Sequence, residues 1–435
     1  MTSRVSLSYA CCVNRACEAS DLFPLSNLLT AFVKQGRLTV IDAAGKTHVF
    51  EGSPGPTVTM RLTDPTLYRK LFFNPELHAG EAYMDGRMSF PGSSLRDFLA
   101  LFSTNRTSLA THPVQAALKR VSRSLKMFQQ ANPIGKAQKN VAHHYDLGND
   151  FYKLFLDERL FYSCAYFATP DDTLEAAQIN KCRLIAAKLC LQPGQKVLDI
   201  GCGWGGLAIY LASVADVEVT GVTLSREQHA LAIERVKAAG LEKRVHLELM
   251  DYRHLDRTFD RIVSVGMFEH VGVGHYDEFF AKVNNLLTAE GLMLLHSIGK
   301  MNPPGTASPW LRKYIFPGAY SPALSEVFPA TERAGLWVTD CEFLRLHYAT
   351  TLSHWQRRFE ANRAKVAAIY DERFCRMWEF YLISAEMMFR TGNQEVFHMQ
   401  LAKRRDAAPI VRDYIVDRQR ELRIREAQVL RPVTG

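Results

Sequence analysis

The second half of the chain alternates short apolar runs with longer helical patterns, from about residue 196 onward. Strands that alternate with helices predict a doubly wound α/β sheet, in which helices cover both faces. We expect seven strands, at 196–201, 217–223, 246–251, 261–266, 292–299, 336–346 and 395–403.

The first hundred residues have a different pattern. Segments of alternating apolar and polar residues, separated by Gly and Pro, predict short strands at 37–42, 47–52 and 57–62, and a helical pattern follows them. We therefore expect a small N-terminal α+β domain. The predicted division is an N-terminal lipid- or substrate-associated domain at 1–102, a basic linker at 103–140 and a catalytic domain at 141–435.

A glycine-rich turn follows the first strand of the predicted sheet. Asp199, Gly201 and Gly203 lie in the sequence DIGCGWGG, between an apolar strand and a helical segment. Glycine lets the backbone turn sharply and lets a ligand approach main-chain atoms. The spacing differs from the GxGxxG pattern of dinucleotide-binding proteins, and no GK[ST] follows to indicate a phosphate loop. The strand–turn–helix context predicts a nucleoside-type ligand.

The ends of the next two strands carry polar residues that suit the same ligand. Crevices at the carboxyl ends of strands are where open α/β sheets bind ligands. Asp251 taken alone could equally be a helix cap. The pattern resembles class I S-adenosylmethionine-dependent methyltransferases. We expect ribose contacts from Thr223, Leu224, Ser225 and Gln228, and adenine contacts from Asp251 and Tyr252.

Further motifs resemble one family, the cyclopropane-fatty-acyl-phospholipid synthases and mycolic acid cyclopropane synthases. The resemblance covers about residues 141–403, and HAGEAYMDGRMSF extends a weaker one into the N-terminal domain. It implies a class I methyltransferase (Rossmann-like) seven-stranded sheet with helical insertions and S-adenosyl-L-methionine as cofactor. The motifs are HYDLGNDFYKLFLDERLFYSCAYF, VLDIGCGWGG, VTLSREQ, MFEHVG, LLHSIG, YIFPGAYSPALSEV, LHYATTLSHW and FCRMWEFYL.

The resemblance also implies a reaction and a set of roles. The family transfers a methylene group to a cis double bond of a phospholipid acyl chain, with a bound bicarbonate ion understood to be the base. Tyr162 and Ser163 would contact the cofactor. Cys164, Glu269, His296, Ile298 and Tyr348 would form the catalytic, bicarbonate-binding pocket.

Each pocket residue also has a purely structural interpretation. Cys164 could be a small buried hydrophobe, Glu269 a helix cap, His296 a hydrogen-bonded core residue and Tyr348 a packed aromatic. Their places within matching motifs favour the anion pocket. In the last motif region, Ala385 stands where some relatives carry a cysteine that has been proposed as catalytic.

A second departure lies in the segment FPGAY. Ala319 stands where many relatives have glycine, which bears on the lining of the acyl channel. Neither departure removes a group that the mechanism above requires, because that mechanism has no covalent enzyme intermediate.

Composition narrows the classes of protein. Apolar residues make up 47% and charged residues 23%, which is typical of a globular protein. No apolar run reaches the ~18 residues of a membrane span, the N-terminus does not resemble a secretory signal, and nine scattered cysteines favour a reduced compartment. We expect a cytoplasmic protein that associates peripherally with the inner face of the membrane, and no metal site.

The net charge of +8 lies in two flanks. Residues 98–145 hold seven basic and no acidic residues, and residues 401–435 hold nine basic and five acidic ones. An apolar stripe at 114–128 with basic residues around it predicts an amphipathic helix, which could lie on an anionic membrane or simply pack with a solvated basic face. The C-terminal flank is more typical of a solvated surface helix.

The leading hypothesis is therefore a phospholipid cyclopropane synthase, with membrane phospholipids as partners. The alternative keeps the fold and substrate but yields a methyl- or methylene-branched chain. A nucleic-acid methyltransferase would explain the charge but not the motifs around Cys164 and Glu269, so no nucleic-acid partner is expected. A non-catalytic lipid-binding protein would not need the intact Gly-rich turn. A homodimer is compatible with the sequence.

Overall fold

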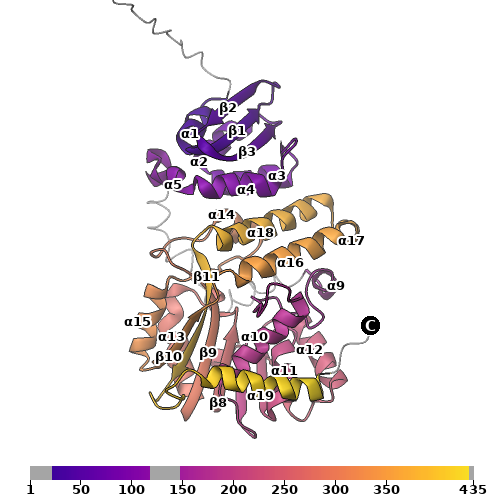
Figure 1. Cartoon of the computed structure of the whole chain (residues 1–435), viewed down its shortest axis with the longest axis vertical. Helices are drawn as coiled ribbons and strands as arrows, with labels where there is room; N and C mark the ends of the chain where they lie inside the picture. Colours follow the sequence, from indigo (N-terminus) through magenta and orange to yellow (C-terminus); the bar gives the residue numbers. More distant parts are fainter. Residues whose placement is uncertain (1–21, 118–146, 431–435) are drawn as a thin grey trace, which may run out of the picture.

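A small N-terminal unit lies at one end of the elongated molecule (Figure 1). The computed structural model describes residues 22–117 and 147–430. The four-stranded sheet of this unit has the order β2-β1-β3-β4, and β1 is parallel to β3 and antiparallel to β2. Its strands are β1 (Gln35–Ile41), β2 (Thr47–Glu51), β3 (Ser53–Leu62) and β4 (Met88–Ser89).

The alternating pattern of these strands explains how the unit is packed. Leu38 and Val40 of β1, and Val58 and Met60 of β3, are buried, whereas the residues between them are less so. Helices cover the buried face and complete the core. They are α1 (Leu25–Phe32), α2 (Thr66–Phe73), α3 (Pro75–Met84), α4 (Leu95–Thr104) and α5 (Arg106–Thr111).

The large unit contains a seven-stranded sheet of order β10-β11-β9-β8-β5-β6-β7. Strand β11 is antiparallel to both neighbours, and the other paired strands of the sheet are parallel. All seven predicted strands are present, which confirms the α/β class. They are β5 (Lys196–Ile200), β6 (Glu218–Thr223), β7 (Val245–Leu249), β8 (Phe259–Val265), β9 (Leu287–Lys300), β10 (Trp337–Phe343) and β11 (Gln394–Ala402).

Helices cover both faces of this sheet. On one face α10 (Leu174–Lys188), α11 (Gly206–Ala215) and α19 (Tyr414–Val429) pack against one another, and on the other α13 (Tyr276–Leu286) packs against α15 (Leu324–Arg333). Two antiparallel helices lie above the carboxyl edge of the sheet, between it and the N-terminal unit (Figure 1). These are α16 (His347–Ala361) and α18 (Glu372–Arg390). The remaining α-helices within the described residues are α9 (Asn149–Lys153), α12 (Arg226–Ala238), α14 (Pro309–Tyr314) and α17 (Arg363–Ile369).

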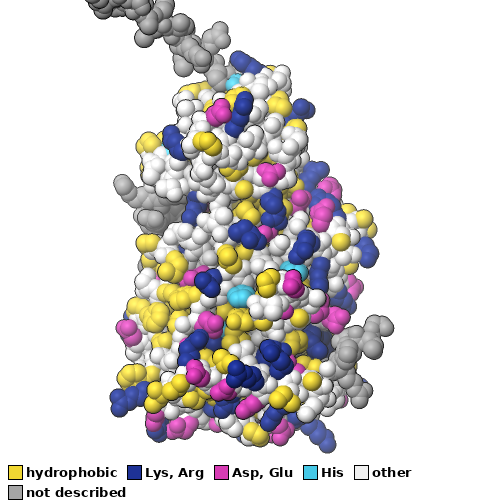
Figure 2. All heavy atoms as spheres, viewed as in Figure 1, with side chains coloured by type: hydrophobic (Ala, Val, Ile, Leu, Met, Phe, Trp, Pro, Cys, Tyr) yellow, Lys and Arg dark blue, Asp and Glu magenta, His cyan; other side chains and the backbone are white. Residues whose placement is uncertain are grey.

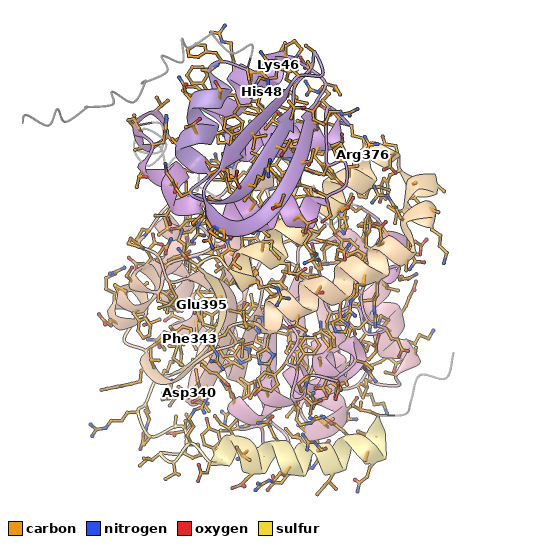
Figure 3. The ribbon with its side chains drawn as sticks, turned by 45° about the horizontal axis from the view of Figure 1, so that its top comes forward. Lys46, His48, Asp340, Phe343, Arg376 and Glu395 are labelled. Carbon is orange, nitrogen blue, oxygen red and sulfur yellow. The ribbon has the colours of Figure 1, made fainter. Side chains whose placement is uncertain are left out.

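The two units share a well-packed interface. Helices α3 and α4 contact α18, and α3 also contacts α14. A Cβ on Gly80 of α3 would lie 2.4 Å from Nε1 of Trp310, so only glycine allows this approach. The Tyr83 hydroxyl donates to Glu379 at 2.9 Å. Arg376 of α18 extends toward the N-terminal unit (Figure 3), where its guanidinium lies close to Gly86.

The two basic flanks differ in how far they can be described. The predicted amphipathic helix at 114–128 lies mostly outside the described residues. In the C-terminal flank, Arg404 pairs with Glu290 and Arg412 with Asp340. Basic and acidic side chains are interspersed over the face of the large unit in Figure 2. Within the described ranges, no helix combines the length and apolar character needed to cross a bilayer.

Candidate functional site

A cavity of about 180 Å³ opens at the carboxyl edge of the large sheet. It lies at the end of β5, which pairs with β6 on one side and with β8 on the other. Open α/β sheets bind ligands at such a position. Ten of the predicted cofactor residues line it: Tyr162, Ser163, Asp199, Gly201, Gly203, Thr223, Leu224, Gln228, Asp251 and Tyr252.

The glycine turn after β5 forms the floor of this cavity. Gly201 and Gly203 have φ angles of 86° and 53°, a region that other residues rarely adopt. A Cβ on Gly201 would lie 2.9 Å from the Cβ of Met267, which also lines the cavity. Asp199 is buried beside the turn, and its Oδ2 has no hydrogen-bond partner within the described structure. Burial raises the pKa of Asp199 to about 7, although the charge of Lys181 favours the ionised form.

The predicted ribose residues do not all face the cavity. Thr223, Leu224 and Gln228 line it. Ser225 instead forms the N-cap of α12, where its Oγ accepts a hydrogen bond from the Gln228 backbone N–H at 3.2 Å. Its burial and this cap give Ser225 a structural role that holds the end of β6 against the helix.

Asp251 combines the two roles considered for it. It lines the cavity and also caps a short 3₁₀ helix, where its Oδ1 accepts from the backbone N–H of Arg253 at 3.0 Å. The Arg253 guanidinium forms two further bonds to the carboxylate, at 2.9 and 2.7 Å. Although burial opposes ionisation, these bonds hold the pKa of Asp251 below its usual value. Tyr252 follows on the same cavity wall.

The segment that contains Tyr162 and Ser163 is fixed by buried polar groups. The Asp157 carboxylate accepts from the Phe161 N–H at 2.9 Å, and Gln178 of α10 donates to the Ser163 carbonyl at 3.1 Å. Lys181, one turn further along α10, donates to Ser163 Oγ at 3.0 Å. These contacts explain why a segment without regular structure presents its side chains to the cavity in one arrangement.

Glu269 lies on a 3₁₀ turn between two cavity-lining residues, Met267 and His270. Its Oε1 accepts from the Ile298 N–H at 2.6 Å, which joins two of the predicted anion-pocket residues. Its Oε2 is buried and has no hydrogen-bond partner among the described residues. The Ser297 hydroxyl donates to the Ile298 carbonyl at 3.1 Å, yet it lies near enough to Glu269 to favour the ionised carboxylate. Burial raises the pKa of Glu269 to about 7, against the opposing effect of the Ile298 N–H.

His296 is hydrogen-bonded within the sheet. Its Nδ1 lies 2.7 Å from Nε2 of His398, the residue opposite it on β11. Burial lowers the pKa of His296 to about 3, so the ring is neutral at physiological pH. The Nδ1 of His398 has no hydrogen-bond partner among the described residues. His296 therefore forms a hydrogen bond within the core, as a structural histidine does. It lies on β9, the strand that also carries Ile298.

Cys164 and Tyr348 belong to segments that are joined to each other. The N–H of Ala165, next to Cys164, donates to Thr351 Oγ1 of α16 at 3.0 Å, and Tyr348 lies one turn earlier on that helix. The Cys164 thiol is buried, which raises its pKa. None of the five predicted anion-pocket residues lines the cofactor cavity itself.

Three functional candidates were not predicted from the sequence. Lys181 lines the cavity, and the hydroxyls of Tyr381 and Tyr162 lie 2.9 Å apart. His398 pairs with His296. The sequence carried no signal for Lys181, because the burial of α10 that gives this lysine its importance appears only in the folded structure.

Ala385 and Ala319, the two residues that differ from some relatives, both lie outside the cofactor cavity. Ala385 is a half-buried residue of α18, packed at the margin of the main apolar core. Ala319 lies in the turn after Gly318, where its N–H donates to the Phe316 carbonyl at 3.2 Å. Neither side chain lines the cofactor cavity.

Known proteins share this sequence and fold. The family described as mycolic acid cyclopropane synthetase matches residues 134–399. The cyclopropane-fatty-acyl-phospholipid synthase of Escherichia coli K12 is 39% identical, covering 79% of this chain and 87% of its own length. The tuberculostearic acid methyltransferase of Mycobacterium tuberculosis is 36% identical, over 74% and 78% of the two chains.

A solved structure agrees with the sequence relatives. The crystal structure of mycolic acid cyclopropane synthase CmaA1 in complex with SAH and CTAB superimposes with a TM-score of 0.58 at 36% identity. The match covers 62% of this chain and 99% of that one. The similarity in fold therefore extends over nearly the whole of the smaller protein.

Proposed function

This chain belongs to the mycolic acid cyclopropane synthetase family and is an S-adenosylmethionine-dependent methyltransferase, and we propose that it converts cis double bonds of phospholipid acyl chains to cyclopropane rings. The cavity residues fit the cofactor. A glycine turn leaves room for close approach of a ligand, and the buried Asp199 has an oxygen without a partner in the described structure. When bound, the cofactor supplies an electrophilic methyl group on a sulfonium.

One observation carries the proposal: a buried carboxylate, with one oxygen that has no hydrogen-bond partner among the described residues, lies next in the chain to residues that line the cavity. Glu269 is on the turn whose neighbours, Met267 and His270, line the cavity. Ring formation requires a proton to leave the newly added methyl group, so a base is needed close to the cofactor. A carboxylate whose pKa is near 7 can hold and orient such a base without being fully neutralised.

We take the base to be a bound bicarbonate, as the family resemblance implies. The residues fit such an anion, because Glu269 Oε2 is free to accept its hydroxyl and the pocket is buried. Cys164, through its main chain, and Ile298, His296 and Tyr348 would surround it. When bound, bicarbonate supplies a base that is not itself covalently attached to the protein. The neutral His296 can act as donor or acceptor, according to its tautomer.

Aromatic side chains beside this pocket suit a cationic reaction. The rings of Tyr162 and Trp355 stack with centroids 5.1 Å apart, and those of Tyr348 and Phe389 lie 4.7 Å apart. Aromatic faces attract a cation, and such a shell also excludes the water that would otherwise capture it. These rings are therefore suited to a sulfonium and to the carbocation-like centre formed on the acyl chain.

Access to phospholipids requires contact with a membrane surface. We propose that the chain acts in the cytoplasm as a peripheral protein on the inner face of the membrane, with residues 1–102 and the basic 103–140 segment engaging lipid. Each Lys or Arg near an anionic surface contributes about 1 kcal/mol. Binding to anionic vesicles that weakens with salt supports this, whereas equal binding to neutral vesicles contradicts it.

The direct test uses purified protein, vesicles of an unsaturated phospholipid and S-adenosylmethionine with a labelled methyl group. We expect label in the acyl chains and a gain of one carbon and two hydrogens for each converted double bond. Saturated phospholipid in the same vesicles is the matched control and should remain unlabelled. Incorporation into RNA instead of lipid would refute the proposal.

A second product is favoured by one relative. The similarity to a tuberculostearic acid methyltransferase makes a methyl- or methylene-branched chain the rival outcome. A methylene branch and a cyclopropane ring have the same mass, so the lipid product must be examined by NMR. Ring-proton signals identify a cyclopropane, and olefinic methylene signals would show that the proton leaves from another carbon.

A further inference from the structure

Lys181 is a buried cation within the cofactor cavity. Only 1% of the residue is exposed, and its Nζ lies 3.6 Å from the centroid of the Phe161 ring. Its only hydrogen bond to the described residues is the one donated to Ser163 Oγ. Burial lowers the pKa of Lys181, against the effect of Asp157 and Asp199, which favour the charged form. An ammonium group can donate three hydrogen bonds, so this one has capacity left over.

The same cavity holds a buried group of the opposite charge. Asp199 also lines the cavity, and its Oδ2 has no hydrogen-bond partner among the described residues. The two groups interact electrostatically, yet no ion pair within 4.0 Å joins them in the described structure. Separated opposite charges in a buried cavity are costly unless a ligand satisfies both.

We infer that Lys181 binds the α-carboxylate of the amino-acid end of the cofactor, together with Ser163, while Asp199 receives the α-ammonium. This inference rests on the proposed function. An α-amino acid presents a carboxylate and an ammonium a short distance apart, which matches a cation and a carboxylate that line one cavity without pairing with each other. The charge-assisted bonds would satisfy both buried groups at once.

A merely structural role for Lys181 makes a different prediction. In that case, Lys181 would only hold the 161–163 segment through Ser163, and its loss would weaken every nucleoside ligand equally. The two roles are separated by ligands that differ in the carboxylate alone. S-adenosylhomocysteine carries it, and the decarboxylated analogue, with a primary amine at the same end, does not.

The experiment measures the affinity of both ligands for wild type and Lys181→Met by calorimetry. We expect Lys181→Met to bind S-adenosylhomocysteine about 10–100-fold more weakly, as for loss of a hydrogen bond between charged groups. Its affinity for the decarboxylated analogue should stay within about threefold of wild type, or rise. An equal loss for both ligands, or none for either, overturns the inference.

Lys188→Met is the matched control. Lys188 is a second fully buried lysine on α10, but it pairs with Asp340 and Glu342 away from the cavity. Its replacement should lower the stability of the protein and leave the affinity of S-adenosylhomocysteine unchanged. The comparison separates damage to α10 from the loss of a ligand contact.

Two further outcomes are decisive. If Lys181→Met does not fold, the ¹⁵Nζ resonance of Lys181 in the labelled wild type should shift with S-adenosylhomocysteine and not with the decarboxylated analogue. Equal shifts with both would overturn the inference alone. Failure of wild type to bind S-adenosylhomocysteine would overturn the proposed function, and this inference with it.

Discussion

The two halves of the candidate site are built differently. The cofactor half, over β5 and β6, is an open cavity whose walls carry polar atoms without protein partners, such as Asp199 Oδ2. The predicted anion half, over β9 and β11, lies outside the lining of that cavity, and several of its polar groups bond to one another, as in the pairs Glu269–Ile298 and His296–His398. The cofactor half can therefore receive a ligand with little structural change. In the predicted anion half, several polar groups already have hydrogen-bond partners within the protein.

The two buried carboxylates make the contrast specific. Burial raises the pKa of both Asp199 and Glu269 to about 7. The ionised form of Asp199 is favoured by a neighbouring charge, Lys181, and that of Glu269 by a backbone N–H from Ile298. Lys181 can be replaced by mutation, whereas the backbone N–H of Ile298 cannot. The carboxyl groups of Asp199 and Glu269 therefore have similar pKa values but different neighbours, and mutations can test the two groups separately.

The largest expected effect is on the anion half. Glu269→Gln should lower the rate of cyclopropane formation about 10²–10⁴-fold, because the base would lose the carboxylate that orients it. The affinity for S-adenosylhomocysteine should remain within about twofold of wild type, since Glu269 does not line the cofactor cavity. Lipid profiles of a bacterial host that lacks cyclopropane lipids, expressing either protein, give the readout. Equal amounts of cyclopropane lipid would remove Glu269 from the mechanism.

The next effect should be confined to the cofactor half. Gly201→Ala places a Cβ against Met267 at a positive φ, so we expect a loss of about 1–3 kcal/mol in unfolding free energy and weaker binding of S-adenosylhomocysteine. Gly194→Ala is the control, because Gly194 has a φ of 78° and open space around it, away from the cavity. Urea unfolding and calorimetry provide the measurements. Unchanged ligand affinity in Gly201→Ala would mean that the turn does not hold the ligand.

The pH dependence of stability should report the buried acid in the anion half. The folded pKa of Glu269, about 7, lies above its usual value of 4.5, so its contribution to stability is full below about pH 4.5 and is lost as the pH rises to 7. Across that window, wild type should lose up to ~1.4 kcal/mol per pH unit relative to Glu269→Gln. Urea unfolding of both proteins between about pH 4 and pH 8 measures the difference. Parallel curves would contradict the raised pKa.

The smallest effect concerns a positioning residue between the two halves. Tyr381→Phe removes the hydrogen bond to the Tyr162 hydroxyl and should cost about 0.5–1.5 kcal/mol of stability. It should also lower kcat more than it changes KM for the cofactor. Tyr276→Phe is the control, because the buried Tyr276 hydroxyl has no hydrogen-bond partner in the described structure. Equal effects of both substitutions would show that the Tyr162–Tyr381 contact is immaterial.

Sequence reasoning predicted correctly the features that depend on short segments of the chain. Each strand of the large sheet was predicted, because apolar runs and turn residues are properties of short segments. The antiparallel direction of β11 was not predicted, since it depends on how distant strands pair. The site shows the same difference between local and distant features. The glycine turn was predicted because its pattern lies within one short segment of the sequence.

The contacts that sequence reasoning missed join distant segments. The Tyr162–Tyr381 and His296–His398 pairs bridge 219 and 102 residues, and no local pattern in the chain reports them. Lys181 belongs with these missed contacts, because its burial on α10 is seen only in the folded structure. The roles assigned to the anion pocket remain predictions from the resemblance.

The contact between Gly80 and Trp310 has a consequence for dividing the protein. Trp310 is 1% exposed, and Met84, Leu95 and Leu99 of the N-terminal unit belong to the same apolar core as the large unit. A fragment that begins at residue 141 would present this indole and its apolar surroundings to water, which favours self-association. The N-terminal unit therefore covers apolar surface of the large unit, and we expect that exchanging it between relatives would require α14 to be exchanged with it.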